Sequence, residues 1–282
     1  MLSPMTQRSP SPAVDGASGF GALLKEWRRS RGVSQLDLAL SCDVSQRHVS
    51  FIESGRSTPS RGMILHLAAA LAVPLREQNA MLLAAGYAPA FGERELGEPD
   101  MAPVSRALDQ ALRQQEPFPA LVVDAAYTVL HANAAAGRLL GFLFDGAPPV
   151  APDAGGNLVD MLIRPDGLRP LVEDWERTMT WMLRRVRSEY LMEGQPDELK
   201  TLFEDLRAHP DGERLLAQPR DDRDLPVTLN VAFRKGETRL SLFTMIATMG
   251  TPLDVSLQNI RLEFFFPADA ETEAWFRAAA DG

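Results

Sequence analysis

The pattern of apolar and polar residues between Ser34 and Arg56 predicts two short helices joined by a tight turn. The apolar residues recur at spacings that let the helices cross at a steep angle over one small core. Ser34, with Asp37 three residues later, and Ser45 are suited to cap the N-termini of the first and the second helix. Asp43 tolerates the left-handed backbone that such a turn requires. The residues expected in this core are Leu36, Ala39, Leu40, Val44, Val49 and Ile52.

One face of the second helix is free of apolar core residues and carries polar groups that can reach base edges in a DNA major groove. We expect Gln46 and Arg47 to contact bases, and Gln35 to hold a phosphate. Glu53 either touches the DNA or orients Arg47 or Arg56. The pattern also fits any small helical bundle with a polar surface, but the caps, turn and spacing together favour DNA binding. The expected DNA-contacting residues are Gln35, Ser45, Gln46, Arg47, His48, Ser50, Glu53, Arg56 and Ser57.

Further helices are expected around this pair. Thr58-Pro59 is a suitable start for a helix with a buried stripe, and Leu75 to Ala85 forms the last helix before Gly86. These elements predict an all-helical, five-helix domain over residues 20–90. Residues 1–19, rich in Ser, Pro and Gly, are expected to form a disordered leader, and the acidic residues 91–103 a linker.

From residue 104 onwards the pattern changes to a mixture of helices and strands. The expected strands cover residues 120–124, 128–132, 227–233, 239–249 and 260–266, where apolar and polar residues alternate or apolar residues run together. The expected helices cover residues 104–115, 133–140, 168–192, 196–208 and 272–280, with a loop at 148–156. This order predicts a five-stranded antiparallel sheet with helices packed on one face, as in PAS-like sensor domains. The expected fold class of the whole chain is therefore α+β, with a sensor and dimerisation domain over residues 104–282.

The charge is unevenly distributed. The chain has a net charge of −9, but residues 20–90 carry 8 Lys and Arg against 5 Asp and Glu, so the surplus there is positive. Phosphate contact requires such a surplus. The acidic remainder is expected to face away from DNA, although acidic surfaces also simply keep proteins in solution. The single cysteine, Cys42, excludes an intrachain disulfide and is expected to fill the turn between the two helices.

A ligand cavity is expected between the sheet and its helices. Met and aromatic residues suit a flexible or acyl-like molecule, and His131 and Thr244 could bind its polar group. Asn133 and Arg177 are further polar candidates, but they fit a helix cap and a solvated charge better. The same residues are equally compatible with an ordinary core. The expected lining residues are Val122, Leu130, His131, Met161, Trp175, Met179, Met182, Thr244, Met245 and Phe264.

Catalytic chemistry is not indicated. The four histidines are scattered, and the chain has no HExxH, GxGxxG, GxSxG or phosphate-loop motif. A pair of Asp124 and His131 on neighbouring strands would lack a nucleophile. We expect neither a metal nor a cofactor. No stretch approaches the roughly 20 apolar residues of a membrane span, and residues 1–19 lack a signal-peptide core, so a cytoplasmic location without membrane contact is expected.

Two resemblances sharpen these expectations. The pattern of Gln35, Leu38-Ala39, Val44-Ser45, Val49-Ser50, Glu53 and Gly55 resembles the XRE/Cro-like helix-turn-helix family. The segments LLAAGYAPAF, VVDAAYTVLHANAAAGRLL, DWERT and GTPLDVSLQNIRLEFFFPAD are similar to the MmyB-like transcription regulators. This resemblance implies a PAS-like domain with a fatty-acid-like ligand behind a DNA-binding domain.

Together the expectations describe a one-component regulator that binds an inverted-repeat operator in double-stranded DNA as a homodimer, under control of a small apolar effector. The alternative is a DNA-binding regulator whose C-terminal domain is a protein-interaction module without a small-molecule ligand.

Overall fold

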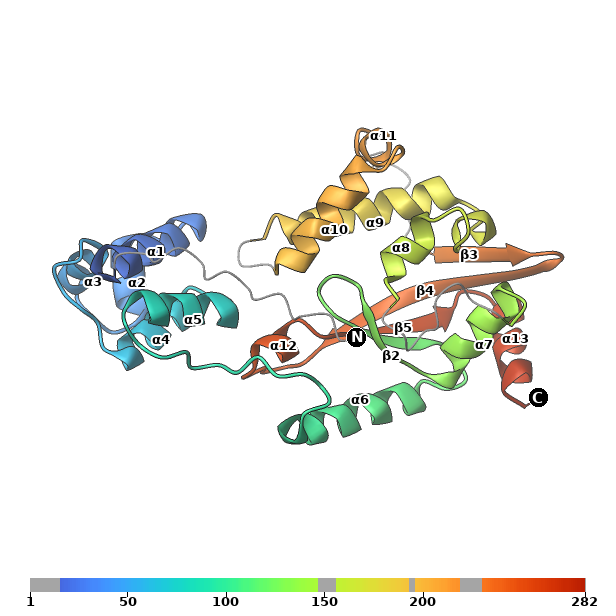
Figure 1. Cartoon of the computed structure of the whole chain (residues 1–282), viewed down its shortest axis with the longest axis horizontal. Coiled ribbons are helices and arrows are strands. Elements are labelled where there is room, and N and C mark those ends of the chain that lie inside the picture. The colour runs from blue at the N-terminus through green and yellow to red at the C-terminus, as the bar shows by residue number, and fades with distance from the viewer. Residues whose placement is uncertain (1–15, 147–155, 193–195, 219–229, 282) are drawn as a thin grey trace, which may run out of the picture. The chain divides into compact units, whose positions relative to one another are not determined.

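The computed structural model describes residues 16–146, 156–192, 196–218 and 230–281 (Figure 1). The expected loop at 148–155 and the first three residues of the expected strand 227–233 lie outside these ranges, as does the expected leader up to residue 15. Contacts between residues divide the chain into two units that meet between Gly92 and Glu93.

The N-terminal unit consists of helices packed around one core. They are α1 (Gly16–Ser30), α2 (Gln35–Ser41), α3 (Gln46–Glu53), α4 (Arg61–Ala70) and α5 (Leu75–Ala84). Since α1 begins at Gly16, the end of the expected leader is helical. The core side chains are Phe20, Leu24, Trp27, Leu38, Ala39, Cys42, Val49, Ile52, Ile64, Leu67, Ala68, Leu71, Val73, Met81 and Leu82.

The N-terminal caps of α2 and α3 and the turn between these helices agree with the expected pattern. The Ser34 hydroxyl accepts from the Asp37 amide in a capping box, and the Ser45 side chain accepts from the His48 amide. Asp43 has the expected left-handed backbone, with φ of 51°. At α4, however, the cap is Ser60 and not Thr58.

Two of the expected core residues face outward. Leu36 and Leu40 are 49% and 71% exposed, whereas Leu38 is fully buried. The reason is the start of α2: because each residue turns the helix by 100°, Leu38, Ala39 and Cys42 share the inner face while Leu36 and Leu40 point away. The spacing of the apolar residues alone did not show which of these two sets faces the core.

The C-terminal unit is built on an antiparallel sheet of five strands in the order β2-β1-β5-β4-β3. The strands are β1 (Ala120–Val123), β2 (Val129–Ala132), β3 (Asn230–Lys235), β4 (Thr238–Thr248) and β5 (Arg261–Pro267). The α-helices of this unit are α6 (Ala102–Gln114), α7 (Ala134–Leu143), α8 (Leu158–Ile163), α9 (Trp175–Tyr190), α10 (Asp197–Ala208), α11 (Gly212–Leu216), α12 (Val255–Gln258) and α13 (Ala270–Asp281). The expected α+β fold with a five-stranded antiparallel sheet is confirmed.

Helices cover both faces of this sheet, which corrects the expectation of helices on one face only. Figure 1 shows α6 on one side of the sheet and α8, α9 and α10 on the other. On the α6 side, Leu108 and Leu112 pack against Ala120, Val122 and Leu262. Leu121, Val129 and Phe265 face the opposite side, because neighbouring residues of a strand point in opposite directions.

The segment expected to be a linker, residues 91–103, makes specific contacts. The side chain of Asn79 binds the main chain of Phe91, within the N-terminal unit. In the C-terminal unit, Arg94 donates to Asp254 at 3.0 Å, and Met101 is buried against the α6 core. Two short 3-10 helices, Pro99–Met101 and Arg169–Leu171, precede α6 and α9.

Candidate DNA-contacting surface and ligand cavity

A buried ion pair fixes the helix that carries the polar face. Arg28 of α1 donates to both oxygens of Glu53 at the end of α3, at 2.6 and 3.0 Å, and Gln35 donates to Glu53 Oε2 at 2.7 Å. The Glu53 side chain is only 3% exposed. Burial alone would raise the pKa of Glu53, but the hydrogen bonds from Arg28 and Gln35 outweigh it and hold the pKa below its usual value.

This geometry corrects the role expected for Glu53. Its carboxylate points into the protein, where Arg28 and Gln35 occupy both oxygens, so it neither faces DNA nor orients Arg47 or Arg56. Sequence reasoning missed Arg28, which lies 25 residues earlier on α1. The glycine at position 21 permits the close packing of α1 on α3: a Cβ there would lie 2.7 Å from the carbonyl oxygens of Ile52 and Glu53.

The outer face of α3 is polar and accessible. Gln46 and Arg47 are exposed, His48 and Ser50 are half-buried, and Ser45 caps the helix. The exposed Arg56 and the half-buried Ser57 follow α3 directly. Within the described part of the chain, neither Arg47 nor Arg56 forms an ion pair; each guanidinium instead lies over the ring of Phe51, at 5.0 and 5.8 Å from its centroid. Two cations without an acidic partner are therefore presented beside the polar face.

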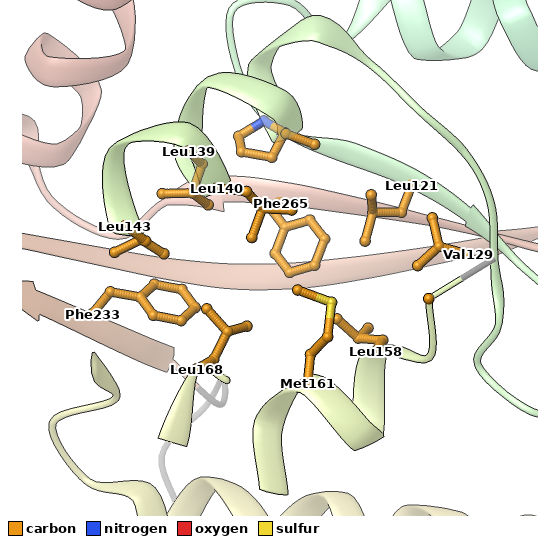
Figure 2. A pocket seen from close by; sticks show the side chains of 13 residues that line it. Leu121, Val129, Leu139, Leu140, Leu143, Leu158, Met161, Leu168, Phe233 and Phe265 are labelled. Carbon is orange, nitrogen blue, oxygen red and sulfur yellow. The ribbon is translucent and has the colours of Figure 1, made fainter. Parts of the chain in front are cut away.

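An apolar cavity lies between the sheet and the helices of the C-terminal unit. It is partly open to solvent. Figure 2 shows Leu139, Leu140 and Leu143 of α7 opposite Leu158, Met161 and Leu168, with Phe265 between the two groups. The described residues that line the cavity are all apolar: Pro119, Leu121, Val129, Ala136, Leu139, Leu140, Leu143, Gly156, Leu158, Met161, Leu168, Phe233 and Phe265.

Of the residues expected to line a ligand cavity, only Met161 does so. Val122, Leu130 and Phe264 belong to the opposite face of the sheet, against α6. Their immediate neighbours Leu121, Val129 and Phe265 line the cavity instead. The error is a shift of one residue, which moves a whole set of strand residues to the other face.

The other expected lining residues also lie elsewhere. Trp175 and Met179 are buried and Met182 is half-buried in the main core, where the Trp175 indole donates to the Leu162 carbonyl at 2.6 Å. Met245 is 57% exposed. His131 is half-buried on β2 opposite Val122, and Thr244 is half-buried on β4 opposite Phe265. Asn133 caps α7, as its alternative assignment predicted.

A partly buried cluster of charges, not anticipated from the sequence, joins α9 to β5. Arg185 donates to Glu263 at 2.9 Å, and Arg261 donates to Glu189 at 2.8 Å. The Tyr127 hydroxyl donates to Glu189 at 3.0 Å. Burial raises the pKa of Tyr127, and Glu189 adds to this effect, whereas the positive charges of Arg185 and Arg261 oppose it. Each arginine has a carboxylate partner, so the cluster fastens the helix to the sheet.

Comparison with known proteins identifies the two parts of the chain. Residues 24–78 match a helix-turn-helix family, and residues 104–279 match the MmyB-like transcription regulator ligand binding domain. The chain belongs to the MmyB-like transcription regulators. It is a DNA-binding helix-turn-helix transcription regulator with an MmyB-like ligand-binding domain, and these families are regulators and not enzymes.

Individual relatives of this MmyB-like regulator match its smaller part. The uncharacterized HTH-type transcriptional regulator RghRB of Bacillus subtilis (strain 168) is 40% identical over 84 residues, which are 29% of this chain and 58% of that protein. The restriction-modification controller protein C.AhdI from Aeromonas hydrophila is 35% identical over 22% of this chain and 94% of its own, with a TM-score of 0.21. The clp gene regulator ClgR from C. glutamicum is 28% identical over 28% of this chain and 96% of its own, with a TM-score of 0.23.

The described residues of this MmyB-like regulator contain no group of three or more His, Cys, Asp or Glu side chains placed to hold a metal ion. Among the helices that the structure describes, none combines the length and the apolar character needed to cross a membrane.

Proposed function

We propose that this regulator binds an inverted-repeat operator as a homodimer, and that a small fatty-acid-like molecule in the cavity beside α7 changes its operator affinity. The observation that carries the ligand part is the cavity lining, in which every residue that the structure describes is apolar. Water gains few hydrogen bonds in such a space, whereas an alkyl chain gains by leaving water. An effector of this class is therefore favoured over a sugar, nucleotide or metal.

The DNA part of the proposal assigns α3 to the major groove. Gln46 and Arg47 lie near its N-terminus, where recognition helices contact bases. Ser45, Ser50, Arg56 and Ser57 lie at the margins of this face and are assigned to phosphates, together with His48 and the free N–H of Gln35. One such helix makes few contacts, so two copies on half-sites about one helical turn apart supply specific affinity.

The polar end of the ligand is assigned to Lys235. On β3, Lys235 follows the cavity residue Phe233 by two positions, so both point to the same face about 7 Å apart. Its ammonium donates to the Phe142 carbonyl at 2.5 Å and to Asp145 at 2.6 Å. The Asp145 side chain is 89% exposed, so a ligand carboxylate can take its place at little cost.

Coupling between ligand and operator requires two states of the protein. An effector shifts DNA affinity only if it binds one of those states more tightly than the other. Filling the space between α7 and α8 favours whichever state keeps these helices apart.

The proposal is tested by native mass spectrometry of the purified full chain, followed by denaturing extraction. A dimer that carries a discrete additional mass, extracted as a long-chain carboxylic acid, is the expected result. A dimer without bound material that also fails to bind added tetradecanoic acid would contradict the ligand part. A stable complex with another protein in its place would favour the alternative, an interaction module with a self-filled core.

A further inference from the structure

Phe51 occupies an unusual place for an aromatic residue. On α3 the inward positions are Val49 and Ile52, which are 0% and 1% exposed. Phe51 is only half-buried, and it belongs neither to the buried core of the N-terminal unit nor to the partly buried residues packed against that core. Its position, four residues after Arg47, places it on the same outer face of the helix. An apolar ring therefore stands in the middle of the polar face.

The ring's neighbours are cations. Arg47 and Arg56 lie over Phe51 at 5.0 and 5.8 Å, within the range of cation–π attraction. The acidic residue next in the chain, Glu53, is bound to Arg28 and cannot neutralise either of them. The two guanidiniums are thus held near one another by an aromatic ring, which suits a surface that meets an anionic partner.

We propose that Phe51 recognises the C5-methyl group of a thymine in the major groove, next to a guanine bound by Arg47. The proposal rests on the proposed function, in which α3 enters that groove. A phenyl ring cannot hydrogen-bond to a base edge, and the thymine methyl is the apolar group that the major groove presents. Arginine, in turn, matches the O6 and N7 acceptors of guanine.

The spacing of the two residues supports this assignment. Four residues of an α-helix rise about 6 Å, and consecutive base pairs are separated by about 3.4 Å. Arg47 and Phe51 therefore reach base pairs one or two steps apart. Because the Arg47 guanidinium already lies over Phe51, its side chain is restrained before DNA arrives, which lowers the entropy lost on binding.

A competing role for Phe51 is that of a platform that only orients the two arginines. Both roles predict weaker binding after removal of the ring, so a protein variant alone does not separate them. Removing the methyl group from the DNA does. Deoxyuridine differs from thymidine by that methyl alone, and a platform role predicts no response to this change.

The experiment uses the full chain and a DNA duplex of the sequence that this chain selects from a random library. Each thymidine is replaced in turn by deoxyuridine, and affinity is measured by fluorescence anisotropy. For the natural protein we expect about a fourfold loss at one position in each half-site, the size expected for one buried methyl group. Phe51→Ala should bind the thymidine and deoxyuridine duplexes equally. Phe51→Leu, which keeps an apolar side chain, should retain part of the discrimination.

Leu83→Ala is the matched control, because Leu83 is a 60% exposed apolar residue on α5. It should leave the methyl discrimination unchanged. Since Phe51 lies outside the core, its variants should melt at the temperature of the natural protein. Equal affinity of the natural protein for all the deoxyuridine duplexes would overturn the inference while leaving the proposed function intact, as would full discrimination by Phe51→Ala. A selection that recovers no preferred sequence would overturn both.

Discussion

The carboxylate of Glu53 accepts two hydrogen bonds from the Arg28 guanidinium, at 2.6 and 3.0 Å, and this pair joins α1 to the helix that carries the DNA-contacting face. The two side chains are 3% and 10% exposed. A buried carboxylate that loses its cation is costly, so the pair determines how firmly α3 is held.

Arg28→Met should therefore destabilise the N-terminal unit by about 3 kcal/mol, because Glu53 remains buried without its partner. Hydrogen exchange of peptides within residues 16–53, followed by mass spectrometry in the full chain, measures this loss. Arg29→Met is the control: the neighbouring Arg29 is exposed and should tolerate the change. Equal protection of α1 and α3 in both variants would show that the pair does not fasten the helix.

The same pair predicts a response to acid. The folded-state pKa of Glu53 is lower than its unfolded value of about 4.5, so its contribution to stability is present above that pH and is lost as the pH falls through the folded pKa. Urea unfolding, followed by circular dichroism between pH 5 and pH 3, should show a steeper loss for the natural protein than for Glu53→Gln. Parallel losses in the two proteins would contradict the assigned direction.

Arg47 and Arg56 should differ in how their loss affects DNA binding. Arg47→Ala is expected to reduce specific binding relative to nonspecific binding by about 1–3 kcal/mol, because a guanine contact is removed. Arg56→Ala should weaken binding to all duplexes alike. It should also reduce the slope of log affinity against log salt concentration by about one, as expected for the loss of one phosphate contact. Anisotropy titrations at several salt concentrations distinguish the two. A uniform loss for Arg47→Ala would reassign it to the phosphates.

Lys235 should give the cavity a preference for acids. The natural protein is expected to bind tetradecanoic acid up to about fivefold more tightly than tetradecanol, the magnitude of a partly exposed ion pair. Lys235→Met should abolish this preference but keep tetradecanol binding, and Lys200→Met, an exposed lysine on α10, should change neither. Asp145→Asn removes the competing carboxylate and should tighten acid binding. An unchanged preference in Lys235→Met, measured by calorimetry, would place the polar end of the ligand elsewhere.

The parts of the fold that depend on local chemistry could be predicted from the sequence. The caps at Ser34 and Ser45 and the left-handed turn at Asp43 require particular side chains at particular positions, so the sequence reveals them directly. The number of strands followed in the same way from alternation and turn residues.

The side of a helix or strand on which a given residue lies could not be predicted from the sequence in the same way. Leu36 and Leu38 both fit a helical stripe, and only the packing of α2 decides that Leu38 is inside. Likewise, Leu121-Val122 and Phe264-Phe265 are apolar at both positions because α6 covers the second face of the sheet, so alternation gives no signal there. The ion pair of Arg28 and Glu53 joins segments that lie far apart in the sequence, so neither composition nor local spacing predicts it.

The central claim, that occupancy of the cavity controls operator affinity, is tested most directly with the delipidated chain of 282 residues. Its affinity for the selected duplex is measured by anisotropy with and without saturating tetradecanoic acid. Two variants are measured in the same way. Ala136→Phe fills the cavity, and Gly137→Ala is the control, because a Cβ at that position would meet no atom within 4 Å. We predict a change of at least about fivefold on adding the acid to the natural protein and to Gly137→Ala, and no change in Ala136→Phe. Identical operator affinities with the cavity empty and filled, while native mass spectrometry shows the acid bound, would contradict the claim.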